Sequence, residues 1–289
     1  LILGITLLIV TCARDEDSEA LRRESLTRKL TDDINADSLA SYVSWMEGMG
    51  TRFALADNHR DVAMAILSKF KTMGYSNTRL DSFVLDRTNE DIRYMQWQYN
   101  VIATLEGTTF PDSVCIAGAH YDDNLITGDP FSIDPGANDN ASGVAAALEL
   151  ARVIRKNNFS PQNTIEFIAF GAEELGLYGS RAYAAQANNS SKKIKMMLNN
   201  DMIAYEPGVD PSLWNVIIMD YDNSHDLRQE AEKMCLKYTS LSYTNDNAFN
   251  QQSDSYPFYT EGFKALFFFS NTMDPGYHSL DARPVNCNF

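Results

Sequence analysis

The sequence is poor in basic residues and in cysteine. Its 24 Lys and Arg residues stand against 39 Asp and Glu residues, which gives a net charge of -15, and the basic residues form no cluster. Nucleic acids and anionic membrane surfaces bind to concentrated positive charge, so we expect neither as a partner. The four cysteines have no zinc-type spacing, and those beyond Cys12 are odd in number, so we expect no disulfide framework.

The chain also lacks internal repeats, low-complexity segments and any second regime of composition. With 289 residues, 44% of them hydrophobic, it can bury one sizeable core. We therefore expect a single domain of catalytic size and assign it residues 34–289. Nothing in the sequence fixes the oligomeric state.

No run is long enough to cross a bilayer, although residues 1–10 are almost wholly apolar. This run resembles the hydrophobic region of an export signal. Cys12 follows it as the lipid-modified cysteine follows the signal of a bacterial lipoprotein, although Thr11 departs from the small residue usual before that cysteine. We expect residues 1–12 to be the remnant of an export signal. The protein would then be a periplasmic or cell-envelope lipoprotein or, with a plain signal peptide, a secreted protein.

Residues 13–33 are charged and show no sustained apolar face, so we expect a flexible tether there. Beyond them, apolar runs alternate with helical patterns. The runs that predict strands buried on both faces are 99–105, 113–119, 164–170, 195–199, 215–219 and 264–270. The helical patterns are 39–49, 62–73, 144–154, 180–187 and 224–238. This alternation predicts an α/β fold, a three-layer α/β/α sandwich around a mainly parallel, mixed sheet.

Acidic and histidine side chains recur just beyond the predicted strands, where ligands bind in such sheets. These residues are His120, Asp122, Glu173, Glu174, Asp201 and His278. Asp139 is placed differently, in a turn marked by Pro135 and Gly136 just before the helix predicted at 144–154. An isolated acid in such a turn is most simply a helix cap. Because the other acidic and histidine residues recur on both sides of it along the chain, Asp139 is a candidate ligand instead.

Imidazole nitrogen and carboxylate oxygen are zinc ligands, and a pair of zinc ions needs a shared ligand between them. A carboxylate can bridge two ions, whereas an imidazole normally cannot. With Asp139 as the bridge, one ion would take His120 and Asp201, and the other would take Glu174 and His278. Three carboxylates against two dications leave one positive charge, which a bound hydroxide would neutralise.

Glu173 and Asp122 are left with supporting roles. Glu173 adjoins the site and is the natural general base, taking a proton from the activated water and passing it to the leaving amine. Asp122 is suited to accept the free N–H of His120 and so fix its tautomer. The remaining candidates are more simply structural, the histidines as satisfied residues and the acids as turn or capping residues: His59, His225, Asp123, Asp134 and Asp254.

Five motifs give the chain a family resemblance. They are Gly118-Ala119-His120-Tyr121-Asp122, Asn138-Asp139-Asn140-Ala141-Ser142-Gly143, Ala172-Glu173-Glu174-Leu175-Gly176, Asn200-Asp201-Met202-Ile203 and Tyr277-His278. The chain resembles the di-zinc aminopeptidases of the bacterial leucyl aminopeptidase family, which are related to glutaminyl cyclases. With supporting patterns such as Ser253-Asp254, the resemblance covers roughly residues 35–282.

The resemblance implies a zinc exopeptidase-like fold and two zinc ions bound by His120, Asp139, Glu174, Asp201 and His278. It also implies Glu173 and Asp122 as the catalytic pair and a cis peptide bond after Asp139. The activity implied is zinc-dependent aminopeptidase hydrolysis of the N-terminal bond of peptides that have a free amino end, by water that two metals activate. Two alternatives stay open, a glutaminyl cyclase-type acyltransferase and a catalytically dead, lipid-anchored binding protein.

Two features depart from the family. Ser255 stands where relatives often carry His, which would alter the substrate side of the cleft without removing a ligand. Relatives also usually continue beyond the position of His278 into a helix that covers the sheet. Because the chain stops soon after that position and lacks an initial Met, we expect it to be a fragment.

Overall fold

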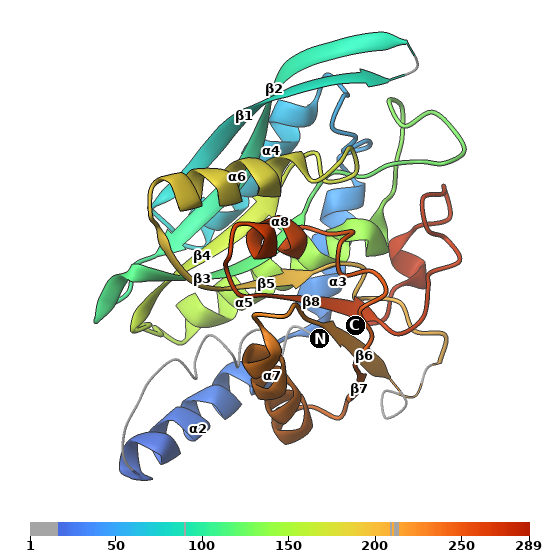
Figure 1. Ribbon diagram of the computed structural model, residues 1–289. Helices are drawn as coiled ribbons and strands as arrows, with labels where there is room; N and C mark the ends of the chain where they lie inside the picture. Colours follow the sequence, from blue (N-terminus) through green and yellow to red (C-terminus); the bar gives the residue numbers. More distant parts are fainter. Residues whose placement is uncertain (1–16, 90, 209, 211–213) are drawn as a thin grey trace.

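The computed structural model describes residues 17–89, 91–208, 210 and 214–289, with side chains from residue 21 onward in the first range. Its centre is an eight-stranded mixed sheet in the order β1-β2-β4-β3-β5-β8-β6-β7 (Figure 1). The strands are β1 (Thr78–Asn89), β2 (Ile92–Leu105), β3 (Phe110–His120), β4 (Asn163–Phe170), β5 (Lys193–Asn200), β6 (Asn215–Met219), β7 (Ser242–Thr244) and β8 (Ala265–Ser270). Four of the pairings are parallel: β3 with β4, β3 with β5, β5 with β8, and β6 with β7.

Helices cover both faces of this sheet. They are α2 (Asp17–Asp32), α3 (Ala36–Glu47), α4 (His59–Thr72), α5 (Ser142–Lys156), α6 (Tyr178–Asn189), α7 (His225–Tyr238) and α8 (Ser255–Thr260). Apolar residues of α3, α4, α5 and α7 share one core cluster with the sheet. Residues of α6 and α8 form another cluster, on the face turned to the viewer in Figure 1. The predicted three-layer α/β/α sandwich is therefore confirmed.

The six predicted strands and five predicted helices each correspond to an observed element, with ends that differ by a few residues. The long edge strand β1 was not predicted, because its residues alternate between buried and solvent-exposed positions and form no continuous apolar run. It pairs along its whole length with β2, also beyond the predicted start of that strand at residue 99. The first predicted helix begins after Asn35, whose side chain accepts the N–H of Ser38, and thus starts before the predicted residue 39.

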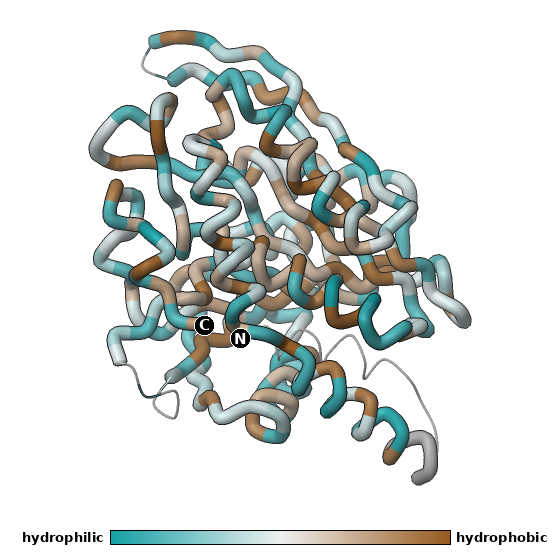
Figure 2. Tube along the Cα trace, turned by 180° about the vertical axis from the view of Figure 1, so that it is seen from behind, coloured by the Kyte–Doolittle hydropathy of each residue, from teal (hydrophilic) through white to brown (hydrophobic). Residues whose placement is uncertain are grey.

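The prediction of a flexible tether at 13–33 is wrong for the part that the structure describes, since Asp17–Asp32 form α2. Leu26, Leu30 and Ile34 recur at helical spacing, and this short apolar stripe packs against Val153 and Phe159. Hydrophobic positions recur among hydrophilic ones along α2, the helix that projects from the body in Figure 2. The helix is amphipathic over only two turns, too few to register as a sustained apolar face.

The expected export-signal remnant at 1–12, with Cys12, lies outside the described residues. In the part of the chain that the structure describes, none of the helices combines the length and the apolar character that crossing a bilayer requires.

Candidate metal centre

The residues expected to bind metal meet at the carboxyl edge of the sheet. Strands β3, β4, β5 and β8 run parallel, so their carboxyl ends open on the same side. The side chains gathered there are His120 at the end of β3, Glu173 and Glu174 after β4, Asp201 after β5, His278 after β8, and Asp139 in the kinked turn η1 (Ala137–Ala141). Segments far apart in the sequence thus supply one cluster.

Asp139 lies between two pairs, each made of a histidine and a carboxylate. Its Oδ1 is 3.2 Å from Nε2 of His120, which is 3.4 Å from Oδ1 of Asp201. Its Oδ2 is 3.1 Å from Nε2 of His278, which is 2.9 Å from Oε1 of Glu174. Within each triad the ligand atoms lie within 4.8 Å of one another. A carboxylate that turns one oxygen to each triad is placed as a bridging ligand would be.

The electrostatics of the cluster favour bound cations. Burial lowers the pKa of His120, but the carboxylates of Glu173 and Asp201 outweigh burial and hold this pKa well above its usual range. Burial also lowers the pKa of His278, yet hydrogen bonding to carboxylates, that of Asp139 foremost, raises it to about 10. Both imidazoles would therefore hold a proton at neutral pH if no metal were bound. Bound cations would reduce the electrostatic repulsion between the closely spaced carboxylates.

The donor set fits zinc. Oδ1 of Asp201 is buried and has no hydrogen-bond partner among the described residues. The other oxygen, Oδ2, accepts a hydrogen bond of 2.6 Å from the hydroxyl of Ser253, which in turn accepts one from the amide of Asn199. One carboxylate oxygen is thus fixed while the other faces the cluster. Imidazole nitrogen and carboxylate oxygen, held in this way, are ligands that zinc takes.

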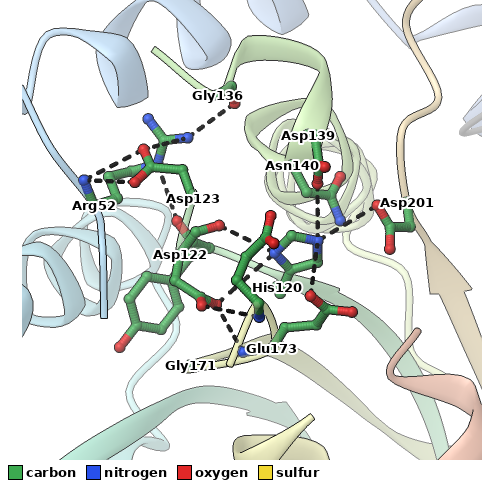
Figure 3. A network of polar contacts seen from close by, with 12 residues as sticks. Arg52, His120, Asp122, Asp123, Gly136, Asp139, Asn140, Gly171, Glu173 and Asp201 are labelled. Atoms are coloured by element: carbon green, nitrogen blue, oxygen red, sulfur yellow. Dashed lines mark hydrogen bonds and ion pairs between the residues drawn. The ribbon is translucent and has the colours of Figure 1, made fainter. Parts of the chain in front are cut away.

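Asp122 supports the cluster in a different way from the one expected. Nδ1 of His120 lies 3.0 Å from the backbone carbonyl oxygen of Asp122, whereas the nearest carboxylate oxygen is 3.8 Å away (Figure 3). The carboxylate instead accepts the backbone N–H groups of Glu173, at 3.0 Å, and Glu174, at 3.2 Å. Backbone N–H groups at a buried strand end need an acceptor. The main chain of Asp122 therefore orients the imidazole, and its side chain holds the two glutamates.

Glu173 lies beside the cluster and is only 8% exposed. Its Oε2 is 3.9 Å from Nε2 of His120. Burial raises the pKa of Glu173 well above its usual range; His120 lowers it, and the neighbouring Glu174 raises it further. A buried carboxylate whose pKa is raised takes up a proton more readily than an ordinary glutamate, as general-base catalysis requires.

The peptide bond between Asp139 and Asn140 is cis, as the family resemblance implied. The Asn140 side chain donates to the carbonyl of Asn200 at the end of β5 and accepts the N–H of Gly143 in the first turn of α5. A Cβ on Gly143 would lie 2.4 Å from that same carbonyl oxygen, so only glycine allows this approach. The turn that carries Asp139 is thus fixed directly to the strand that precedes Asp201.

A buried arginine beneath the cluster was not predicted. Arg52, which is fully buried, forms an ion pair of 3.1 Å with Asp123 and donates to the carbonyl of Gly136 (Figure 3). It also donates to the carbonyls of Tyr121 and Pro135. Asp123 is therefore a buried ion-pair partner rather than a turn or capping acid. The signal in the sequence was a lone arginine directly before a fully buried apolar stretch, residues 53–56. Arg52 joins the loop after β3 to the turn that leads to Asp139.

The residues expected to be structural lie outside the two triads. His59 contacts the carbonyls of Ala56 and Trp97, and His225 pairs with Asp220 at 2.6 Å. Asp254 precedes α8 but does not cap it with its side chain. Burial raises the pKa of Asp254 to about 7, although His120 opposes this rise.

A cleft of about 520 Å³ opens over the cluster. One part of its lining is acidic, formed by the carboxylates of the cluster. Another part is apolar, formed by Met202, Phe249, Phe267, Phe269 and Met273. Phe269 packs against both Phe249 and Phe267, with ring centroids 5.9 and 5.7 Å apart. The cleft thus places an apolar surface beside the candidate metal centre.

Comparisons with known proteins identify the family of the chain. Residues 100–288 match Peptidase family M28, and the chain belongs to that family. A Pyricularia oryzae protein named Probable zinc metalloprotease is 44% identical over 110 residues, which are 38% of this chain and 22% of that protein. Leucine aminopeptidase 1 of Ajellomyces capsulatus is 29% identical over 185 residues, covering 63% of this chain and 46% of that protein. The chain spans less than half the length of these relatives.

Solved structures share the fold. The Legionella pneumophila LapA aminopeptidase superposes with a TM-score of 0.73 at 22% identity, covering 95% of this chain and 70% of that one. Bacteroides thetaiotaomicron glutaminyl cyclase superposes with a TM-score of 0.66 at 17% identity, covering 89% of this chain and 92% of that one. At these identities the likeness extends to the fold alone.

Proposed function

We propose that this protein is a zinc-dependent aminopeptidase that releases the first residue of peptides with a free amino end. The observation that carries the proposal is the position of Asp139, with one oxygen toward each of two triads. His120 and Asp201 would hold one zinc ion, Glu174 and His278 would hold the other, and Asp139 would bind both. Membership of a peptidase family supports hydrolysis of peptide bonds.

The residues of the chain divide the chemistry between them. Bound zinc supplies positive charge that polarises the scissile carbonyl and favours ionisation of the attacking water. Glu173 accepts a proton from that water on its carboxylate and delivers it to the leaving amine. Asp122 keeps the two glutamates and His120 in place through the contacts described above. These contacts fix the backbone of the proposed base relative to the candidate ligands.

The apolar wall supports a preference for a hydrophobic first residue. Met202, Phe249, Phe267 and Phe269 lie in the same cleft as the candidate metal ligands. Burying the side chain of leucine in such a place contributes about 1.5–3 kcal/mol to binding relative to leaving it in water. The relative named leucine aminopeptidase supports the same preference.

The test is release of leucine from leucine amide by protein that has been stripped with a chelator and then reloaded with zinc. We expect no turnover in the stripped protein, recovery on reloading, and about two zinc ions per chain. Peptides with N-terminal glutamine serve as the second substrate, because a glutaminyl cyclase shares this fold. Ring closure of the glutamine peptides without release of leucine would favour the cyclase. A protein that binds no stoichiometric zinc would instead be a binding protein.

We also propose that the protein is exported and that Cys12 carries a lipid anchor. The apolar run at 1–10 and the cysteine that follows it support this proposal. Cys12→Ser should move the expressed protein from the membrane fraction to the soluble fraction. Unchanged membrane association of Cys12→Ser would contradict lipidation.

A further inference from the structure

We infer that Arg181 binds a carboxylate of the substrate on the leaving-group side of the scissile bond, and so makes short or acidic peptides preferred substrates. The inference rests on the proposed function and names the substrate class within it. The carboxylate belongs either to the C-terminus of a dipeptide or to an acidic side chain in the second position.

The charge of the cleft points to Arg181. Of the described residues that line the cleft, four carry carboxylates: Asp139, Glu173, Glu174 and Asp201. Arg181 is the only lysine or arginine among them. Two zinc ions would balance four carboxylates, since four positive charges meet four negative ones. The charge of Arg181 then remains unbalanced at the cleft, in a protein whose net charge is otherwise strongly negative.

The contacts of Arg181 leave its guanidinium available. The residue lies in the first turns of α6, and its Nε donates to the carbonyl of Gly176 at 3.1 Å. Within the described part of the chain, no carboxylate forms an ion pair with it. By contrast, Arg93, Arg152 and Arg228 each have a carboxylate within 2.8 Å. The two terminal nitrogens of Arg181 are thus free to bind a carboxylate in the bidentate manner that a guanidinium favours.

The position of Gly176 links Arg181 to the reaction centre. Gly176 follows the Glu173-Glu174 pair by two residues, and its N–H donates to the carbonyl of Glu173 at 2.8 Å. Arg181 is therefore fastened to the same loop that carries the proposed base. The apolar wall accommodates the first side chain, so the polar region around Gly176 and Arg181 is left for the rest of the peptide.

A matched control stands beside Arg181. Arg87 donates to the carbonyl of Leu175, the residue directly before Gly176, but it is not among the described residues that line the cleft. Both arginines donate to the same loop, and of the two only Arg181 lines the cleft. Arg87→Gln therefore tests the structural role of such a contact, and Arg181→Gln tests that role together with carboxylate binding.

The experiment compares kcat and KM of the zinc-loaded protein and its variants on matched substrate pairs. Leu-Ala against Leu-Ala amide tests the C-terminal carboxylate, and Leu-Glu amide against Leu-Gln amide tests the acidic side chain. We expect the wild-type protein to prefer the carboxylate in at least one pair by about 2- to 5-fold in kcat/KM, the modest effect of a solvent-accessible ion pair. Arg181→Gln should abolish the preference by raising KM, with kcat unchanged, and Arg181→Lys should retain part of it. Arg87→Gln should keep the preference.

The outcomes separate this inference from the proposed function. A wild-type protein that cleaves leucine amide but shows no preference in either pair overturns the inference and leaves the proposed function standing. An Arg181→Gln variant that loses activity equally on every substrate overturns it too, because that result is the structural effect of the Gly176 contact. Failure of the zinc-loaded wild-type protein to cleave any of the substrates would count against the proposed function itself.

Discussion

Replacing Glu173 with glutamine tests the proposed base directly. The substitution keeps the size of the side chain, and the backbone N–H of residue 173 can still donate to Asp122. The carboxylate that would accept the proton is lost, while the five proposed ligands are untouched. General-base catalysis contributes about 10²- to 10⁴-fold to turnover. We therefore expect kcat to fall by that factor, which corresponds to about 2.7–5.4 kcal/mol of transition-state stabilisation, with KM little changed.

The assay pairs kinetics with metal analysis. Glu173→Gln should retain zinc, whereas Glu174→Gln, which removes a carboxylate 2.9 Å from His278, should lose part of it. Glu173 is near enough to His120 and Glu174 to bind a metal itself, so the zinc content distinguishes a base from a ligand. A Glu173→Gln variant that keeps more than about a tenth of the wild-type kcat would refute the role of base. A variant that loses zinc would make Glu173 a ligand.

Three further perturbations have expected outcomes. Without metal the pKa of His278 is about 10, so below that pH zinc must displace a proton, and the affinity for zinc should fall as the pH falls. Calorimetry at pH 8 in two buffers should detect the released protons, and zinc binding without proton release would contradict this expectation. Asn247→Ala removes two hydrogen bonds of 3.0 Å to Asp220 that hold the segment carrying Phe249. The KM for leucine amide should therefore rise about threefold or more at constant kcat, and an unchanged KM would count against a role of this segment in substrate binding. Arg52→Met leaves the buried carboxylate of Asp123 unpaired and should lower the free energy of unfolding, measured in urea, by about 3–5 kcal/mol. A loss under 1 kcal/mol would show that the ion pair contributes little to stability.

The central strands and the clustering of the candidate ligands were predictable because each leaves a local pattern. Strand β4 is buried at every residue, and its sequence is mostly apolar, with Glu166 its one charged residue. His120, Glu173 and Asp201 could be placed because each follows a strand, and parallel strands end at one edge of a sheet. The gathering of these residues at one edge could therefore be predicted without knowledge of the strand order.

Other features depend on contacts that no local pattern records. The apolar stripe of α2 is short and is stabilised by Val153 and Phe159, which lie far along the chain. Apart from the carbonyl of Met46, the side-chain partners of Arg52 come from residues 121–136, so its burial follows from the tertiary fold. Asp122 lies two residues from His120, and sequence proximity suggested a side-chain contact. Its carboxylate lies closer to N–H groups that only the folded chain brings near.

The double attachment of Asp122 has a consequence for mutational scanning. Asp122 holds the imidazole of His120 through its carbonyl and the two glutamates through its carboxylate. Most substitutions of Asp122 will therefore abolish activity even if its side chain never exchanges a proton. Inactivity of Asp122→Ala would therefore be no proof of direct chemistry. Asp122→Asn is more informative, because its amide oxygen can still accept a hydrogen bond from one of the two backbone N–H groups. Survival of turnover in that variant would mark the aspartate as scaffolding.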